Sequence, residues 1–144
     1  MPQVDFYTIK ESTLQGRLNF ACRLTEKAFT TGMKVYLHTD NANTAEELDN
    51  LLWSFKPESF IPHAIQGVLS TEEENELPVL IGYGSNQSHP DELLINLAET
   101  IPSSHQSFTR IAEIIINDDE AKELSRQHWR EYKTAGHDLN HHQL

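Results

Sequence analysis

The chain has 144 residues, of which 38% are hydrophobic, and its formal net charge is −11. This length corresponds to one ordinary domain, which would bury roughly 70% of the surface of its unfolded chain. The excess of 22 acidic over 11 basic residues repels a phosphate backbone, so the composition disfavours direct binding to nucleic acid. No stretch approaches the roughly 18 uncharged apolar residues that a membrane span requires.

The first residues lack the basic region and apolar core of a signal peptide. The single cysteine, Cys22, excludes an internal disulfide and fits a reducing compartment. We therefore expect a cytoplasmic protein. Cys22 lies among apolar residues of a predicted helix, whereas a catalytic thiolate needs an electropositive, partly exposed setting, so we expect it to be a small core residue.

Periodicity predicts the elements of the N-terminal half in the order strand, helix, strand, helix. Gly32 stands where the first helix would end, and Thr44 with Glu47 has the spacing of a capping box that opens the second. Two prolines deny a long helix to the aromatic segment that follows, and a polar, acidic loop comes next. The predicted boundaries are residues 4–9, 13–31, 34–38 and 44–52 for the four elements, 53–63 for the aromatic segment and 70–75 for the loop.

The C-terminal half is predicted to contain three more strands and one helix. The middle strand could instead begin a helix from Asp91, but the proline at position 102 ends the element early and favours a strand. Asn117 and the two aspartates after it open the last helix, and Gly136 closes it. The predicted boundaries are residues 78–82, 93–97 and 110–116 for the strands, 84–90 for a turn-rich connection, 120–135 for the helix and 137–144 for a mobile, His-rich tail.

Strands that alternate with helices predict a single α/β domain over residues 1–136, with three layers and a mostly parallel sheet flanked by helices. The sequence shows no internal repeat and no linker long enough to divide the chain.

No catalytic constellation is found, and we predict neither a cofactor nor a metal site. The run Gly82-Tyr83-Gly84-Ser85 lacks the third glycine of a dinucleotide fingerprint and the lysine of a phosphate-binding loop, so an ordinary turn is the better interpretation. His38 and Asp40 could meet near a strand end, but a turn cap explains Asp40 equally well. Three histidines of the predicted tail, His137, His141 and His142, could chelate a metal only adventitiously.

The final predicted helix carries an unusual stripe of charge. Lys122, Arg126 and Arg130 recur every four residues, with Lys133 close behind, and this spacing places them on one face beside Trp129. One interpretation is a solvated charged face. The other is a receptor for an acidic peptide that ends in an apolar residue, because guanidinium groups grip carboxylates while an indole supplies apolar contact. The residues alone leave both open.

The aromatic segment is the second unusual feature. Trp53, Phe55, Phe60 and Ile61 lie within nine residues of a proline-interrupted stretch. Some of them belong in the core. The rest could form a protein-protein surface, where Trp and Phe are enriched.

The same segments resemble a known family. An early β-α-β start is followed by Leu52-Trp53, Pro57, Phe60-Ile61-Pro62-His63 and the Leu-Ile-Asn-Leu run that ends at Leu97. The closing helix then carries Arg126, Trp129, Tyr132 and Gly136. Their joint order and spacing are similar to those of the chi subunit of the bacterial DNA polymerase III holoenzyme. Each motif is short, and their order makes the resemblance specific.

The resemblance implies a Rossmann-like fold without a bound nucleotide and a non-catalytic adaptor of the clamp-loader assembly. It implies a surface for the psi subunit that includes Trp53 and Phe60. It also implies a site for the acidic C-terminal tail of single-stranded-DNA-binding protein, which ends in Pro-Phe. Trp129 stands where a tyrosine is common, and Arg130 where a lysine occurs. The residues implied for the tail site are Lys122, Arg126, Trp129 and Arg130.

Two other functions remain as alternatives. A small Rossmann-like enzyme that uses a nucleotide would share the predicted fold. A nucleic-acid-binding module is disfavoured by the net charge.

Overall fold

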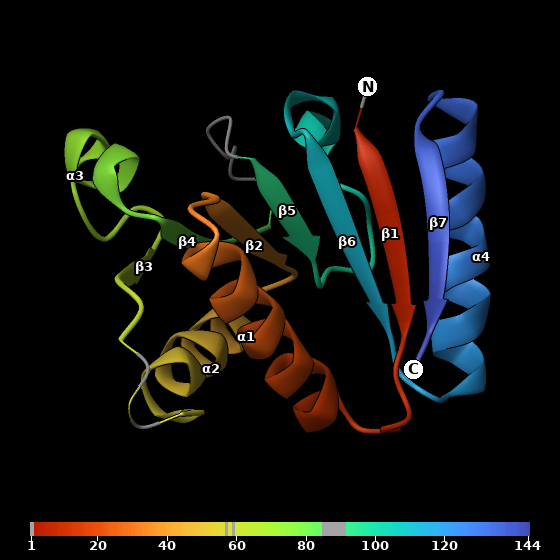
Figure 1. The fold of residues 1–144 in the computed structure, drawn as a ribbon, viewed down its shortest axis with the longest axis horizontal. Helices are drawn as coiled ribbons and strands as arrows, with labels where there is room; N and C mark the ends of the chain where they lie inside the picture. The colour runs from red at the N-terminus through yellow and green to blue at the C-terminus, as the bar shows by residue number, and fades with distance from the viewer. Residues whose placement is uncertain (1, 57, 59, 85–91) are drawn as a thin grey trace.

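A computed structural model describes residues 2–56, 58, 60–84 and 92–144 (Figure 1). Within these residues the elements in chain order are β1 (Gln3–Thr8), α1 (Leu14–Thr30), β2 (Val35–Thr39), α2 (Ala42–Ser54), β3 (His63–Ile65), α3 (Thr71–Glu76), β4 (Val79–Tyr83), β5 (Leu93–Asn96), η1 (Ser103–Ser107), β6 (Arg110–Ile115), α4 (Asp119–Thr134) and β7 (Asp138–Gln143). The strands form one sheet in the order β3-β4-β2-β5-β6-β1-β7, and all of its pairings are parallel.

Helices lie on both faces of the sheet, so the predicted three-layer α/β fold is confirmed. Apolar side chains of α1 and α2 pack against alternate residues of the central strands, and Tyr132 of α4 packs against Phe6 and Ile111 on the opposite face. Because both faces of the central strands are covered, β2 is buried along its whole length. Among the described helices, none is long and apolar enough to cross a membrane.

Local capping confirms most of the predicted helix ends and corrects one. Gly32 has φ +85° just beyond α1, as a helix C-cap requires. The proposed capping box at Thr44 is wrong, because α2 begins earlier: the side chain of Asn41 accepts a hydrogen bond from the Thr44 backbone N–H at 2.9 Å. A true capping box lies elsewhere. Ser70 and Glu73 cap each other's backbone and open α3, where the acidic composition had predicted a loop.

The predicted strand at 93–97 is confirmed as β5, while the alternative helix start at Asp91 and almost all of the predicted turn at 84–90 lie outside the described residues.

The predicted mobile tail is wrong, because residues 138–143 form the edge strand β7. Gly136, with φ +89°, reverses the chain after α4, and β7 then pairs with β1 in parallel along its length. Two tail histidines are tied to β1: His141 Nε2 lies 2.8 Å from Thr8 Oγ1, and His142 Nε2 lies 3.0 Å from an Asp5 carboxylate oxygen. An edge strand needs backbone pairing more than buried side chains, which is why its polar sequence gave no strand signal.

Deleting residues 138–144 should therefore lower the free energy of unfolding by about 2 kcal/mol or more, because β1 loses a full ladder of hydrogen bonds. Urea denaturation followed by circular dichroism measures this change. An unchanged midpoint would show that the segment contributes nothing to the fold.

Candidate protein-binding sites

Capping and charged residues stabilise both ends of helix α4. The Asp118 side chain accepts a hydrogen bond from the Ala121 backbone N–H at 3.1 Å, and acidic residues fill the first turn, where the helix dipole favours them. Lys133 lies in the last turn, where a cation is favoured. His128 and Tyr132 are its buried residues, and Ala121 and Trp129 are partly buried against the same core cluster.

A buried carboxylate on β6 fixes the position of α4. Glu113, 3% exposed, accepts hydrogen bonds from Tyr132 Oη at 2.7 Å and Asn96 Nδ2 at 2.8 Å, and its Oε1 lies 2.9 Å from His128 Nδ1. The other ring nitrogen of His128 lies 2.7 Å from the Glu99 carbonyl oxygen. Both ring nitrogens thus face oxygen acceptors, and only the imidazolium form has two N–H donors to satisfy them.

The protonation of this cluster follows from its surroundings. Burial alone would lower the pKa of His128, but the hydrogen bond and negative charge of Glu113 outweigh burial and raise that pKa above 6.5. Burial and the same carboxylate raise the pKa of Tyr132 well above its ordinary value, so the phenol stays protonated and donates.

The outer flank of α4 and the carboxyl halves of β1, β6 and β7 enclose a pocket of about 410 Å³, called the α4 pocket below. Trp129 forms one wall, with its ring centroid 5.1 Å from that of Phe6. Two guanidinium groups, of Arg126 and Arg130, stand at exposed positions beside it. The lining residues are Phe6, Thr8, Ile115, Ser125, Arg126, Trp129, Arg130 and His141.

Three of the four residues predicted for the tail site line this pocket. Lys122 does not: its ammonium donates to Asn117 Oδ1 at 3.0 Å near the start of α4. Arg126 makes an exposed ion pair with Glu123 at 2.9 Å, which a stronger anionic partner could replace at little cost.

The strand side of the pocket is not among the residues predicted from the sequence. Phe6, Thr8 and Ile115 come from β1 and β6, and His141 comes from a segment predicted to be mobile. Alternation along β1 places Phe6 and Thr8 on one face, but nothing local shows that α4 covers that face. The completed pocket has an apolar floor and a cationic rim, and it therefore suits an anion with a large apolar group.

The aromatic segment divides into core and surface. Ile61 is fully buried and Phe55 packs against the core, whereas Trp53 is 46% exposed and Phe60 is 75% exposed. The rings of Trp53 and Phe60 lie 5.6 Å apart, and we call this pair the aromatic patch. The buried ring of His63 supports it, with its centroid 4.2 Å from that of Trp53.

The two candidate surfaces lie at opposite ends of the sheet. The aromatic patch belongs to α2 and the approach to β3, one edge strand, while the α4 pocket lies beside β7, the other edge (Figure 1). Both could be occupied at once.

Other features considered in the sequence have structural explanations. Cys22 is fully buried, and burial raises the pKa of its thiol to about 12, so it is a core residue. A side chain at Gly82 would overlap the hydroxyl of Tyr36, so this glycine allows close packing. The tail histidines do not converge, because His141 faces the α4 pocket while His142 bonds Asp5 and stacks on Tyr7.

Fold and site together define an α/β protein with an open parallel sheet and an exposed pocket beside its last helix. A DEAD box protein from the hyperthermophile Methanococcus jannaschii has a similar fold, with a TM-score of 0.58 and 15% identity over 100% of this chain and 42% of that chain. This likeness concerns the fold alone.

The chain belongs to the DNA polymerase III chi subunit (HolC) family, whose sequence model matches residues 1–140. It is 40% identical to the DNA polymerase III subunit chi of Pseudomonas aeruginosa, over 100% of this chain and 98% of that protein. It is 26% identical to the subunit chi of Escherichia coli, over 97% of each. The resemblance inferred from the sequence is thereby confirmed.

The Glu113–His128 pair predicts a pH-dependent stability. Because the folded state raises the pKa of His128, the pair contributes most below the unfolded value of 6.5, and this contribution is lost as pH rises through the raised pKa. Glu113→Gln should cost about 1–3 kcal/mol at about pH 5.5 and less at about pH 8.5. Urea unfolding of both proteins at the two pH values measures the difference. An equal cost at both would mean that His128 does not titrate differently in the folded state.

Proposed function

We propose that this chain is a non-catalytic accessory subunit of DNA polymerase III, which tethers the clamp-loader assembly to single-stranded-DNA-binding protein. It would bind the psi subunit through the aromatic patch and reach the clamp loader through psi. It would bind the acidic C-terminal tail of single-stranded-DNA-binding protein through α4. The family membership supports the replication role, and the two separate surfaces support the adaptor role. A cytoplasmic location follows from this proposal.

The α4 pocket is the observation that carries the proposal. A tail that ends in Pro-Phe presents a phenyl ring, a terminal carboxylate beside it and further acids upstream. The wall formed by Trp129 and Phe6 can receive the ring, since aromatic pairs favour tilted or edge contacts at 4.5–7 Å. Arg126 then lies within one helical turn of that wall and can grip the carboxylate with two N–H donors.

The remaining cations are suited to the upstream acids. Arg130 is exposed at the pocket's rim, and Lys122 is half-buried one turn before Arg126. Exposed pairs of this kind contribute little individually and weaken with salt. Arg130 and Lys122 would therefore affect the association rate and the position of the bound tail more than its final affinity.

The aromatic patch supports the psi contact. Trp53 and Phe60 are large, exposed and in contact with one another, and the ring of Trp53 packs against the buried ring of His63. Aromatic residues of this kind dominate the energy of protein-protein interfaces.

The cations and the indole of the tail site should behave differently when removed. Arg126→Ala should weaken binding of an acidic peptide ending in Pro-Phe by about 2 kcal/mol, because it strands a partly desolvated carboxylate. Arg130→Ala and Lys122→Ala should each cost about 1 kcal/mol or less, and this cost should shrink with salt. Trp129→Ala should weaken binding with little change in salt dependence. Calorimetry at low and high salt measures all four.

Lys133→Ala, a cation on α4 outside the pocket lining, is the matched control and should leave binding nearly unchanged. Equal, fully salt-sensitive losses at all the cations, with none at Trp129, would mean a diffuse electrostatic patch and would contradict a specific pocket.

Phe60→Ala should weaken psi binding by on the order of 2 kcal/mol while leaving tail binding intact. The ring is 75% exposed, so its removal should not unfold the protein, and circular dichroism checks this. Leu144→Ala removes an exposed apolar side chain at the other edge of the sheet and is the control. Psi that binds the Phe60→Ala protein with undiminished affinity would exclude the aromatic patch from the interface.

A further inference from the structure

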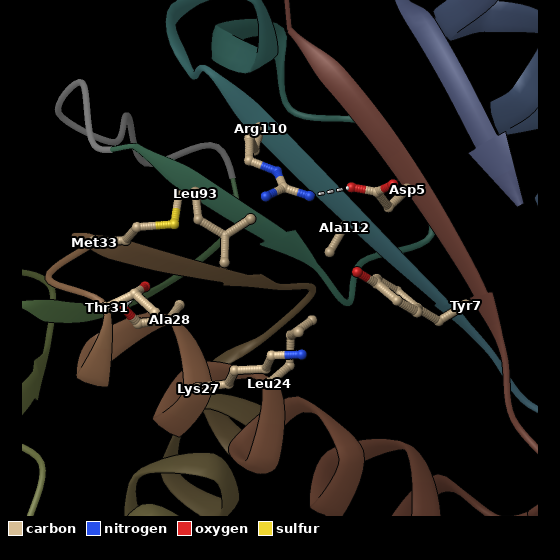
Figure 2. A pocket seen from close by; sticks show the side chains of 10 residues that line it. All are labelled: Asp5, Tyr7, Leu24, Lys27, Ala28, Thr31, Met33, Leu93, Arg110 and Ala112. Atoms are coloured by element: carbon tan, nitrogen blue, oxygen red, sulfur yellow. Dashed lines mark hydrogen bonds and ion pairs between the residues drawn. The ribbon is translucent and has the colours of Figure 1, made fainter. Parts of the chain in front are cut away.

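A second pocket lies on the opposite face of the sheet from α4, between the C-terminal half of α1 and strands β1, β5 and β6. Figure 2 shows that its side chains point toward a common opening. Its volume is about 180 Å³. We call it the α1 pocket, and neither candidate surface described above includes it. The lining residues are Asp5, Tyr7, Leu24, Lys27, Ala28, Thr31, Met33, Leu93, Arg110 and Ala112.

The sheet is incompletely covered at this place. Parallel sheets are almost always covered on both faces, because every strand is flanked by crossover helices. In the described part of the chain, α1 lies mainly against β2 and β6 and reaches β1 through Phe20, and Figure 1 shows no helix over β7 on the α1 side. That face carries Tyr7 and His142, whose rings stack 4.9 Å apart, and Phe20 of α1 lies 5.6 Å from Tyr7. The α1 pocket therefore lies beside a row of three stacked or tilted rings, those of Phe20, Tyr7 and His142.

The electrostatics of the pocket are built on a buried acid. The Asp5 side chain is 5% exposed, and its oxygens lie 2.9 Å from Arg110 Nη2 and 3.0 Å from His142 Nε2. Burial would raise the pKa of Asp5, but the bonds to His142 and Arg110 outweigh burial and lower it. Asp5 is thus ionised, and both of its carboxylate oxygens have a bonding partner. It holds the half-exposed guanidinium of Arg110 at the pocket wall (Figure 2).

Cations exceed anions around this opening. Asp5 is the one carboxylate among the lining residues, and Arg110 neutralises it. Lys27 is exposed on the opposite wall, and no carboxylate partner is found for it within the described residues. Arg23, one turn before Lys27, lies 5.8 Å over the ring of Phe20. In a chain with a net charge of −11, such a local excess of cations favours an acidic ligand.

The size of the pocket narrows the class of ligand. Pockets for drug-sized ligands measure roughly 300–1,000 Å³. A volume of about 180 Å³ with a floor of Leu24, Leu93 and Ala112 instead suits one inserted apolar side chain. We propose that the α1 pocket is a second peptide-docking site, which accepts one large apolar side chain from within an acidic protein segment, with flanking carboxylates at Lys27 and Arg110. It does not rest on the tail site on α4.

The test uses the full ¹⁵N-labelled chain and a blocked peptide, acetyl-Asp-Asp-Glu-Phe-Glu-Asp-Asp-amide, which has no terminal carboxylate. The matched peptide has Ser in place of Phe. Amide shifts should concentrate at Ala28, Met33 and Ala112 with the Phe peptide, and should be much smaller with the Ser peptide. Lys27→Glu should weaken binding about fivefold or more, while Lys10→Glu, an equal charge change outside the pocket, should weaken it less than about twofold.

Arg126→Ala separates this proposal from the tail site, because it should weaken capture on α4 about 30-fold and leave the α1 pocket unchanged. Shifts at Ser125 and Trp129 that vanish in Arg126→Ala would overturn the proposal and place the peptide on α4. No shift at about 2 mM peptide, equal shifts with the Ser peptide, or an unaffected Lys27→Glu protein would also overturn it. So would tighter binding of oligothymidylate at the same residues, since the surface would then serve nucleic acid.

Discussion

The hydrogen bonds of the buried Glu113 carboxylate determine how α4 faces the rest of the molecule. A buried charge is tolerated only when it is paired and bonded, and His128, Tyr132 and Asn96 together satisfy this one. His128 and Tyr132 are four residues apart and so lie on one face of the helix. Anchoring that face to β6 leaves Arg126 and Arg130 on the outer flank, where the α4 pocket forms. Glu113 thus determines which way Arg126 and Arg130 point, although it contacts neither of them.

The edge strand β7 supplies the last side of the α4 pocket, whose other sides are formed by α4, β1 and β6. Without β7, β1 would end the sheet, and the outer flank of α4 would face only Phe6, Thr8 and Ile115 among the residues that line the pocket. With β7 in place, His141 closes the pocket on one side, and His142 helps to keep Asp5 ionised on the other face. One polar strand therefore contributes to both pockets. The aromatic patch at the opposite edge is independent of it, as the proposed tether between two partners would require.

The sequence predicted the fold well because its signals are local. Alternation, helical spacing and capping residues identified β1, α1, β2 and α4, and the stripe of Arg126, Trp129 and Arg130 needed only the geometry of one helix. The N-cap at Asn41 and the capping box of Ser70 and Glu73 are local signals that were misassigned, whereas the other failures depended on partners distant in sequence. The polar strand β7 is stabilised by pairing with β1, and no property of its own residues records that pairing. The α1 pocket is likewise assembled from α1, β1, β5 and β6, so no single segment indicates it.

The acidity of the chain also shapes how its cationic surfaces work. A net charge of −11 repels an acidic peptide at long range, so attraction begins only within about a Debye length of the local cations, roughly 8–10 Å at physiological salt. Added salt screens this repulsion together with the local attraction, and the two changes partly cancel. In the proposed function, specific capture would therefore depend on contacts that salt does not screen, namely the apolar contact at Trp129 and Phe6 and the close bonds of a partly desolvated guanidinium. An acidic adaptor with an aromatic pocket can in this way select an acidic tail with an apolar end over polyanions in general, including the nucleic acid beside which it would act.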